Sequence, residues 1–391
     1  MPAERPSNKP VETRVLHYKS RFLNPSETFI ERLVTAHETV RAQGMCLRRL
    51  QLCPGFPVHS VPPAWRPAFW VNFLFFHVNL PLPFYRRTLR KVRPHVLHAH
   101  FGYDGFKVLG LARKRGIPLV VSFYGSDVSR LPDERGWKRR FEAMVDGCAA
   151  VVAASEHMKE KLVSLGFDPA KVHVVYFGLD PERFAFRESY ALQGRMMMVG
   201  RMVEKKGFET AIRGVASLRE RGGRTPELDL YGDGPLRASL QALVGELGLD
   251  GQVRFHGMRG MEDVLRAHGR SDLLLAPSTT ASDGDEEGLP NTILEAMSCG
   301  TPVVSTPHAA IPEVVRHGET GFLVPERAPA ALGDTLEAVY AGRFDLDAIR
   351  RRAHQTILHQ HTQKSMVRKI EAIYHHILSP DPPSHEQARI P

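Results

Sequence analysis

The stretch EGLPNTILE, residues 287–295, carries two carboxylates, Glu287 and Glu295, with seven residues between them. An apolar run at 272–277 precedes it and predicts a buried strand, and Gly300 predicts the end of the following helix. We therefore expect Glu287 on a strand-to-helix loop and Glu295 inside the helix. Free backbone N–H groups at such a helix start suit a phosphate. Taken alone, the two acids fit a surface Glu and an ordinary helical Glu equally well.

A second loop of this kind lies upstream. Residues 196–199 (MMMV) predict a short buried strand, GRMVEKKG follows at 200–207, and a helix is expected over 208–221. Gly200 allows a ligand to approach the backbone closely. Arg201 offers a planar fork to phosphate oxygens, and Lys206 offers a mobile charge. The alternative for both cations is solvated surface charge.

These motifs together resemble family 4 of the retaining nucleotide-sugar glycosyltransferases. The spacing Glu-x7-Glu and the loop Gly-Arg-x4-Lys-Gly both match the donor side of that family. The resemblance is strong over residues 194–326, looser before them, and points to bacterial exopolysaccharide and colanic-acid transferases. It implies the α/β fold called GT-B. In that fold two Rossmann-like, doubly wound parallel-sheet domains face a cleft, and a C-terminal helix crosses back to the first domain.

The resemblance also implies a donor site. Arg201 and Lys206 would neutralise the departing diphosphate, Glu287 would hold sugar hydroxyls and Glu295 ribose hydroxyls. No clear protein nucleophile appears on the opposite face, so the acceptor would attack from the side of the leaving phosphate and retain the anomeric configuration. The expected donor-binding positions are Gly200, Gly257, Met258, Gly288, Leu289 and Glu295.

The length suits two domains with cores of their own, since the chain has 391 residues. Alternating apolar runs and amphipathic stretches indicate βαβ units. We expect an acceptor-binding domain at 1–185 and a donor-binding domain at 193–361. A crossover helix should occupy 362–378, and the proline-containing segment 379–391 should be a disordered tail.

The first half carries weaker motifs. SETFI at 26–30 resembles a helix start in exopolysaccharide transferases, with Ser26 as the cap and Glu27 in the first turn. HAHFG at 98–102 ends a strand, so its loop should face the cleft. We expect one of His98 and His100 to point inward and the other outward, with His100 the better catalytic candidate. A structural role explains His100 equally well.

The sequence FYGSD at 123–127 departs from the family pattern. Many relatives have His-Gly-x-Asp here, and that His touches the donor sugar. Tyr124 stands in its place, and a Tyr donates and accepts hydrogen bonds but is neutral near pH 7. We expect Tyr124 to keep a catalytic sugar contact without supplying an imidazole. Asp127, with Ser26 and Glu27, forms the expected acceptor side, where it orients the loop or caps the next helix.

Positive charge is concentrated in the first half. Residues 1–192 carry 29 Lys and Arg against 17 Asp and Glu, whereas the remainder carries 23 against 26. The basic run at 86–93 follows an aromatic stretch at 65–76, a combination that suits an anionic membrane surface. Charged, amide and proline residues interrupt the aromatic stretch, so it does not predict a membrane-spanning helix. The alternative is a buried helix followed by a solvated charged one.

No cofactor is expected beyond the donor, and no metal. Asp283-Gly284-Asp285 is an Asp-x-Asp motif, but it lies in an acidic loop without strand context. Arg201, Lys206 and the helix start at 288–289 would neutralise the diphosphate instead. The expected partners are a nucleotide-sugar donor, a saccharide or lipid-linked acceptor and an anionic membrane surface. No RNA- or DNA-binding module accompanies the net charge of +9, which argues against nucleic acid.

Four cysteines without CxxC or metal spacing, and a polar first ten residues, indicate a cytoplasmic protein with reduced thiols. Membrane docking would place it on the inner face of the cytoplasmic membrane. Two other classes stay open: a nucleotide-sugar epimerase on the same scaffold and a non-catalytic nucleotide-sugar-binding protein. An epimerase would produce a sugar isomer without an acceptor, and a binding protein would bind the donor without turnover.

Overall fold

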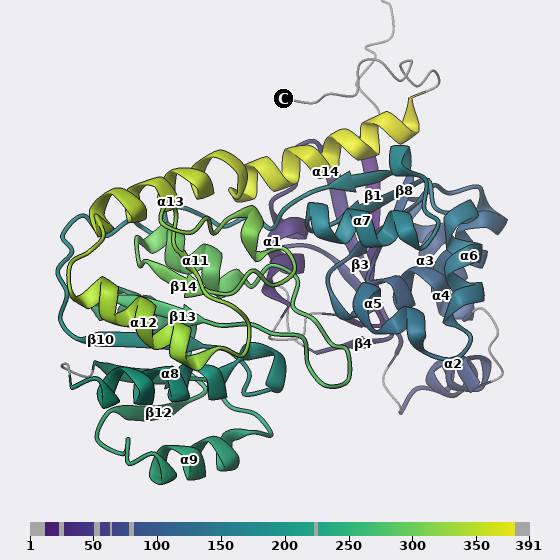
Figure 1. Cartoon of the computed structure of the whole chain (residues 1–391). Helices are drawn as coiled ribbons and strands as arrows, with labels where there is room; N and C mark the ends of the chain where they lie inside the picture. The colour runs from purple at the N-terminus through teal and green to yellow at the C-terminus, as the bar shows by residue number, and fades with distance from the viewer. Residues whose placement is uncertain are drawn as a thin grey trace, which may run out of the picture.

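The computed structural model describes residues 12–22, 27–50, 55–62, 65–77, 82–222 and 226–379. These residues form two parallel sheets in two regions that lie side by side (Figure 1). The first sheet has the strand order β5-β3-β1-β6-β7-β8-β9, and the second β12-β11-β10-β13-β14-β15. In each, the chain starts at a central strand, builds to one edge and then returns to build to the other, as doubly wound sheets do. The predicted α/β architecture of two such sheets is confirmed.

The first region contains seven sheet strands and seven α-helices among the described residues. Its strands are β1 (Thr13–Tyr18), β3 (Val40–Cys46), β5 (Val58–Ser60), β6 (Val96–His100), β7 (Leu119–Phe123), β8 (Ala150–Ala153) and β9 (Val172–Val174). Its helices are α1 (Thr28–Thr35), α2 (Pro67–His77), α3 (Pro83–Val92), α4 (Gly102–Arg115), α5 (Ser126–Ser129), α6 (Trp137–Gly147) and α7 (Glu156–Ser164). A separate two-stranded pair joins β2 (Arg21–Phe22) to β4 (Arg48–Arg49).

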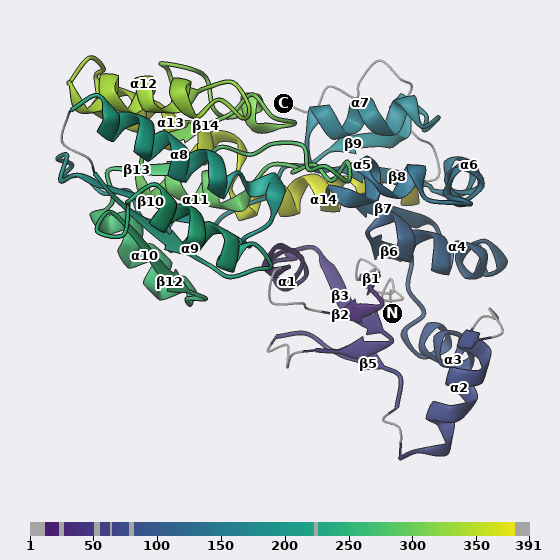
Figure 2. The same cartoon turned by 60° about the horizontal axis from the view of Figure 1, so that its bottom comes forward.

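The second region holds the elements from β10 to α13. Its strands are β10 (Arg195–Val199), β11 (Glu227–Tyr231), β12 (Val253–Gly257), β13 (Leu273–Ala276), β14 (Val303–Ser305) and β15 (Phe322–Leu323). Its helices are α8 (Phe208–Glu220), α9 (Arg237–Glu246), α10 (Met261–Arg270), α11 (Asn291–Cys299), α12 (Pro329–Tyr340) and α13 (Leu346–Gln360). Figure 2 shows the same two regions turned by 60° about the horizontal axis.

Four of the inner strands are buried along their whole length. Every residue of β6, β7, β8 and β13 is buried. Strands covered by helices on both faces read as continuous apolar runs, such as LVVSF in β7, rather than as alternating patterns. Polar residues inside such strands therefore need internal partners, and His98 and His100 of β6 have them at both ring nitrogens, His17 of β1 at Nδ1.

The last helix, α14 (Gln363–Leu378), belongs to the core of the first region although it follows α13 of the second (Figure 1). Ile370 and Tyr374 pack with Val15 and Val120 in one buried cluster. The Glu371 carboxylate accepts hydrogen bonds from the backbone N–H groups of Glu38 and Thr39, at 2.8 and 3.1 Å. The helix thus crosses back to the first domain, as the sequence predicts.

The chain passes between the two regions at two places that lie together. Leu179 and Thr362 form an isolated bridge, and Gln363 donates its backbone N–H to the Leu179 carbonyl at 2.7 Å. The domain limits at 185 and 193 stay predictions. Of the predicted tail, only Ser379 lies within the described residues.

Candidate functional site

The predicted donor-side charges meet at one point. Lys206 Nζ lies 2.8 Å from Glu287 Oε2, and Lys205 Nζ lies 3.5 Å from Glu287 Oε1. Lys206 follows β10 and Glu287 follows β13, two neighbouring parallel strands whose carboxyl ends share one edge. Burial alone would raise the pKa of Glu287, but the two ammonium groups outweigh it and hold that pKa below its usual value. Glu287 is therefore an anion.

A pocket of about 510 Å³ opens beside this pair. Gly200, Arg201 and Met258 line it, with the turn at 232–234. Gly232 has φ +133, and a Cβ on it would meet the Gly200 carbonyl oxygen at 1.9 Å, so only glycine allows the β10 and β11 ends to approach this closely. Gly257 supports the turn by accepting the Gly232 backbone N–H at 2.9 Å.

Arg201 and Met258 are two of the exposed residues that line this pocket, with Asp233 and Arg259. Met258 is 74% exposed, and Arg201 is exposed and forms no ion pair with any described residue. The guanidinium is thus available to an anion that enters the pocket. The pocket has room for a nucleotide, and its glycine-lined wall allows close backbone approach.

Glu295 lies on α11, deeper in the structure than Glu287. It is 6% exposed, and Arg32 of α1 lies 3.9 Å from its Oε1. Burial raises the pKa of Glu295 to about 7, although the Arg32 charge opposes that rise. Leu289 is buried, and the Tyr124 carbonyl oxygen lies 3.1 Å from where a Cβ on Gly288 would stand. The helix start that carries the motif therefore packs directly against the first domain.

Tyr124 and His100 also meet, but inside the first domain. His100 Nδ1 lies 2.7 Å from the Tyr124 hydroxyl, and His100 Nε2 lies 3.0 Å from His17 Nδ1. Phe29 and Phe177 pack against the Tyr124 ring, at centroid distances of 4.7 and 5.8 Å. The Tyr124 hydroxyl is thus hydrogen-bonded to His100, a contact that the sequence did not predict.

The expectation that His98 and His100 face opposite sides was wrong. Residues two apart in a strand share a face, and both side chains are fully buried with ring centroids 4.7 Å apart. His98 Nδ1 contacts the Tyr374 hydroxyl at 2.5 Å, and His98 Nε2 contacts Ser122 at 2.7 Å. His98 thereby joins the crossover helix to β7.

His17, on β1, completes a buried histidine cluster that the sequence analysis missed. One ring nitrogen from each of His17, His98 and His100 lies within 4.8 Å of the others, a grouping compatible with a metal ion. Burial lowers the pKa of all three, for His98 to about 3, so the imidazoles are neutral. The ring nitrogens of His98 and His100 already have hydrogen-bond partners within the protein. The cluster therefore forms a neutral hydrogen-bond network.

The remaining acceptor-side candidates have structural partners. Asp127 is buried and its carboxylate accepts from the backbone N–H groups of Tyr124, Gly125 and Gly102, which ties two cleft loops together and caps α4. Glu27 pairs with Lys19 at 3.2 Å and precedes the first residue of α1, with no side-chain cap bond. Ser26, the predicted cap, lies outside the described residues.

The acidic loop before Glu287 bridges the two domains. Asp283 pairs with Arg130 at 3.3 Å, and Glu286 pairs with Lys161 of α7. Asp285 pairs with Lys205 at 3.0 Å within the second domain. These carboxylates are used in ion pairs with Lys and Arg, and the absence of a metal site at the Asp-x-Asp motif stays a prediction.

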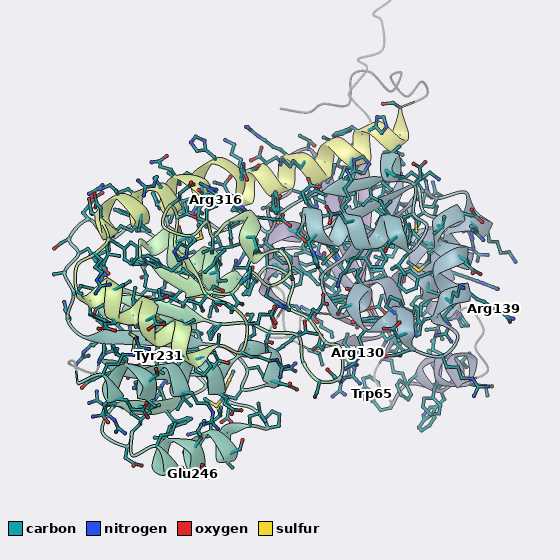
Figure 3. All side chains as sticks on the ribbon, viewed as in Figure 1. Trp65, Arg130, Arg139, Tyr231, Glu246 and Arg316 are labelled. Atoms are coloured by element: carbon teal, nitrogen blue, oxygen red, sulfur yellow. The ribbon has the colours of Figure 1, made fainter. Side chains whose placement is uncertain are left out.

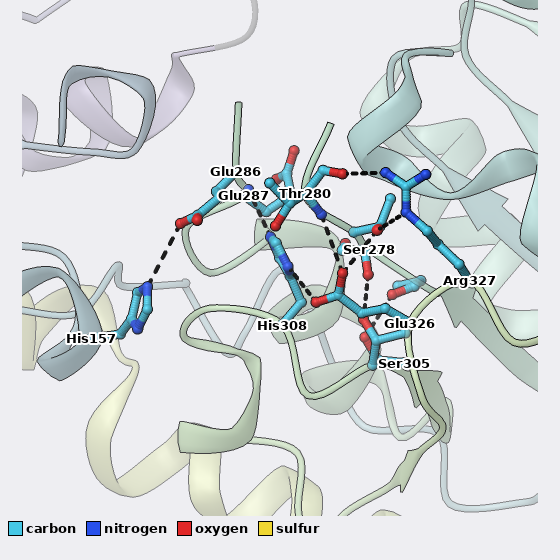
Figure 4. A network of polar contacts seen from close by, with 12 residues as sticks. His157, Ser278, Thr280, Glu286, Glu287, Ser305, His308, Glu326 and Arg327 are labelled. Atoms are coloured by element: carbon cyan, nitrogen blue, oxygen red, sulfur yellow. Dashed lines mark hydrogen bonds and ion pairs between the residues drawn. The ribbon is translucent and has the colours of Figure 1, made fainter. Parts of the chain in front are cut away.

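Two further residues support the Glu287 loop and were missed (Figure 4). His308 Nε2 accepts the Glu287 backbone N–H at 3.1 Å, and His308 Nδ1 lies 2.8 Å from Glu326 Oε1. Both residues follow short strands of the second sheet, β14 and β15. Their position at the carboxyl edge was the signal in the sequence that would have found them.

Outside the cleft, the first domain has an exposed aromatic helix. Trp65, Trp70 and Leu74 are 75%, 59% and 60% exposed, at or on α2. Trp65 and Arg139 lie on the outer surface of this domain (Figure 3). The alternative that the aromatic stretch is a buried helix is therefore wrong. Among the described residues, no helix is both long and apolar enough to cross a membrane.

A basic pocket of about 350 Å³ lies between α3 and α4. Arg86 and Arg90 of α3 and Lys114 and Arg115 of α4 line it. Within the described part of the chain, none of these four cations forms an ion pair with a carboxylate. Such a group of unpaired cations attracts phosphate groups.

Comparison with known proteins gives matches over both domains. Residues 10–183 match the family described as Glycosyltransferase Family 4, and residues 193–341 match Glycosyl transferases group 1. The amylovoran biosynthesis glycosyltransferase AmsK of Erwinia amylovora is 33% identical over 252 residues, which cover 63% of this chain and 61% of AmsK. The putative colanic acid biosynthesis glycosyltransferase WcaL of Salmonella typhimurium is 30% identical over 286 residues, covering 71% and 70%. The chain thus spans about three fifths of AmsK and seven tenths of WcaL.

Solved structures share the fold. The Anabaena protein HepE in complex with UDP-glucose superposes with a TM-score of 0.73 at 17% identity, covering 92% of this chain and 99% of that one. Sucrose-phosphate synthase from Thermosynechococcus elongatus gives a TM-score of 0.72 at 15% identity, covering 93% and 98%. At these identities the likeness establishes the fold, two facing α/β domains, and confirms the expectation of a GT-B architecture.

Proposed function

Because this chain belongs to glycosyltransferase family 4, we propose that it transfers a sugar from a nucleotide-diphosphate sugar to a saccharide or lipid-linked saccharide in bacterial polysaccharide synthesis. The observation that carries this proposal is the partly buried Lys206–Glu287 ion pair beside the pocket that Gly200 and Arg201 line. The names of the relatives, amylovoran and colanic acid transferases, support polysaccharide synthesis. Cavity, cations and carboxylate together suit a donor with a diphosphate and a sugar.

In the mechanism we propose, the nucleotide lies in the pocket and its diphosphate lies near Arg201 and Lys206. These cations stabilise the negative charge that develops as the bond to the anomeric carbon breaks. The acceptor hydroxyl attacks that carbon from the face that the diphosphate leaves, and a diphosphate oxygen takes its proton. The broken and the formed C–O bonds then lie on one face, so the configuration is retained. In this proposal Arg201 and Lys206 supply at the diphosphate the positive charge that a metal ion would otherwise provide.

Glu287 and Glu295 have different parts in this proposal. Glu287 is an anion that accepts hydrogen bonds from sugar hydroxyls. Glu295, whose pKa is raised to about 7, holds ribose hydroxyls and faces Arg32 across the cleft. Domain closure through the acidic loop would exclude water and limit hydrolysis.

The test uses UDP-glucose, UDP-galactose and GDP-mannose, each with and without EDTA. The expected result is a rise in melting temperature with one donor, unchanged by EDTA, together with release of the nucleoside diphosphate when saccharide is added. NMR of the product should show the donor's anomeric configuration. No melting shift and no release with any of the three donors would contradict the proposal. Sugar isomerisation without an acceptor would favour the epimerase instead.

For the acceptor side we propose contact with an anionic membrane surface, where a lipid-linked acceptor would lie. The exposed Trp65, Trp70 and Leu74 supply apolar insertion, and the basic pocket of α3 and α4 supplies phosphate contacts. The protein should co-sediment with phosphatidylglycerol vesicles at low salt and should not co-sediment with neutral vesicles. A protein that stays in the supernatant with both vesicle types would rule out this contact.

A further inference from the structure

His308 lies beside Glu287 although 20 residues separate them in the sequence. Its side chain is 3% exposed, and its Nε2 accepts the Glu287 backbone N–H at 3.1 Å (Figure 4). A backbone N–H only donates, so this ring nitrogen must carry a lone pair. The proton of the neutral imidazole then sits on Nδ1, which lies 2.8 Å from Glu326 Oε1. The contacts therefore run in one direction, with Glu287 donating to His308 and His308 donating to Glu326.

The Glu326 carboxylate also holds the start of the same loop. Its Oε2 accepts from the Thr279 hydroxyl at 2.8 Å and from the Thr280 backbone N–H at 3.3 Å. The loop between β13 and α11 contains no regular helix or strand. His308 and Glu326 thus fix its two ends with respect to each other, which restricts a segment that would otherwise have many conformations.

The backbone next to both residues is strained. Ala309 has φ +47 and Arg327 has φ +54, the left-handed region that non-glycine residues rarely adopt. Ala309 directly follows His308, and Arg327 directly follows Glu326. Such strain persists where the surrounding structure enforces it, and it concentrates at functional sites. The strain is thus independent of the hydrogen bonds and marks the same two positions.

We propose that His308, oriented by Glu326, is a positioning residue that holds the Glu287 loop in the geometry needed to bind the donor sugar. Lys206 holds the carboxylate of Glu287 and His308 holds its backbone, so the orientation of the acid is fixed at two points. This inference rests on the proposed donor role of Glu287. It adds to the Lys206 contact a second contact that holds Glu287, from a residue that would not itself touch the donor.

The hydrogen-bond directions define matched variants. In His308→Gln the longer side chain places an amide oxygen near the former Nε2, where it accepts the Glu287 N–H. In His308→Asn the amide reaches only as far as the former Nδ1, so Glu326 keeps a partner and Glu287 loses one. His354→Asn serves as control, because His354 contacts the Ser298 carbonyl at 2.8 Å elsewhere in the same domain.

The measurements distinguish binding of the nucleotide from binding of the sugar. For each variant, the melting temperature is measured alone, with UDP or GDP, and with the sugar nucleotide on which the wild type turns over, and nucleoside diphosphate release is followed. We expect His308→Asn to keep the nucleotide-induced shift, to lose the extra shift that the sugar adds, and to lose about 10- to 100-fold in kcat/KM, as removal of an orienting partner typically does. We expect His308→Gln to recover most of that loss and His354→Asn to resemble the wild type.

Two results would overturn the inference. One is that His308→Asn shows the same extra melting shift from the sugar, and the same kcat/KM, as the wild type. The other is an equal loss in Gln and Asn variants, both with wild-type melting temperatures in the absence of ligand. If His308→Asn does not fold, Glu326→Gln serves instead and should weaken the sugar increment while the nucleotide shift persists. Failure of the wild type itself to bind any donor would count against the proposed function, and is thus a distinct outcome.

Discussion

The two faces of the cleft differ in their chemistry. The second domain presents charges held in pairs, with Lys205, Lys206 and Glu287 in contact. The first domain instead holds a neutral network behind its cleft loops, in which Tyr124 and the buried histidines bond to one another. Paired charges suit a ligand whose own charge changes, as the diphosphate of the proposed donor would, whereas a buried neutral network fixes the loops that lie over it. The difference teaches that the second domain's side of the cleft depends on electrostatics and the first domain's side on packing.

The sharpest test of this contrast is Lys206→Ala. We expect transfer to fall by about 10²-fold or more, the range for losing one preorganised electrostatic contact. The transfer rate of Glu287→Ala should fall similarly, because Lys206 and Glu287 act together. The measurement is kcat/KM with the preferred donor, and Lys205→Ala is the control with a smaller expected loss, since its nitrogen lies farther from Glu287. Near-wild-type rates for Lys206→Ala and Glu287→Ala would end the assignment of this face to the donor.

A second test concerns the basic pocket of the first domain. Arg86→Glu combined with Arg90→Glu should weaken vesicle binding by about 30-fold or more, since each basic residue near an anionic surface contributes about 1 kcal/mol and the added carboxylates are repelled by that surface. Co-sedimentation with phosphatidylglycerol vesicles measures it. Arg343→Glu with Lys364→Glu makes the same change in net charge on exposed positions elsewhere and should bind as the wild type. Equal losses in both double variants would point to net charge rather than to this pocket.

A third test uses pH on the neutral network. The pKa of His98 is lowered to about 3, and those of His17 and His100 are lowered well below 6.5. The unfolded chain therefore takes up protons first as the pH falls. Stability should be full above pH 6.5 and decline from there toward pH 3. Melting temperatures between pH 8 and 4 measure this decline, and His98→Gln should flatten it. A constant melting temperature from pH 7 to 4.5 would show that the histidines are not neutral in the folded protein.

The smallest expected effect belongs to Tyr124→Phe. The hydroxyl contacts His100 inside the domain, so its loss should cost about 1 kcal/mol of stability. With the hydroxyl held away from the charged face, the transfer rate should change by less than about threefold. Denaturant unfolding and steady-state rates provide both numbers. A rate loss near that of Lys206→Ala would place Tyr124 in direct contact with the donor and break the contrast between the two faces.

Sequence alone determined much of the donor side. Alternating apolar runs and amphipathic stretches predicted βαβ units, because helices on both faces demand continuous apolar strands, and the family resemblance implied the doubly wound arrangement. The spacing in the motifs around Lys206 and Glu287 predicted that both follow strands, and parallel strands bring their carboxyl ends to one edge. Such local patterns can be recognised in the sequence because they depend on residues that are neighbours in the chain.

Tertiary structure alone decided the rest. His17, His308 and Glu326 stand in no local motif, and their partners come from segments far away in the sequence. The contact of Arg32 with Glu295 depends on how the two domains meet. Hydrogen bonds and ion pairs act over a few ångströms, so which groups they join is set by the packing of distant elements. The sequence therefore determined the sheets and the donor loop, and the packing decided which side chains hold that loop in place.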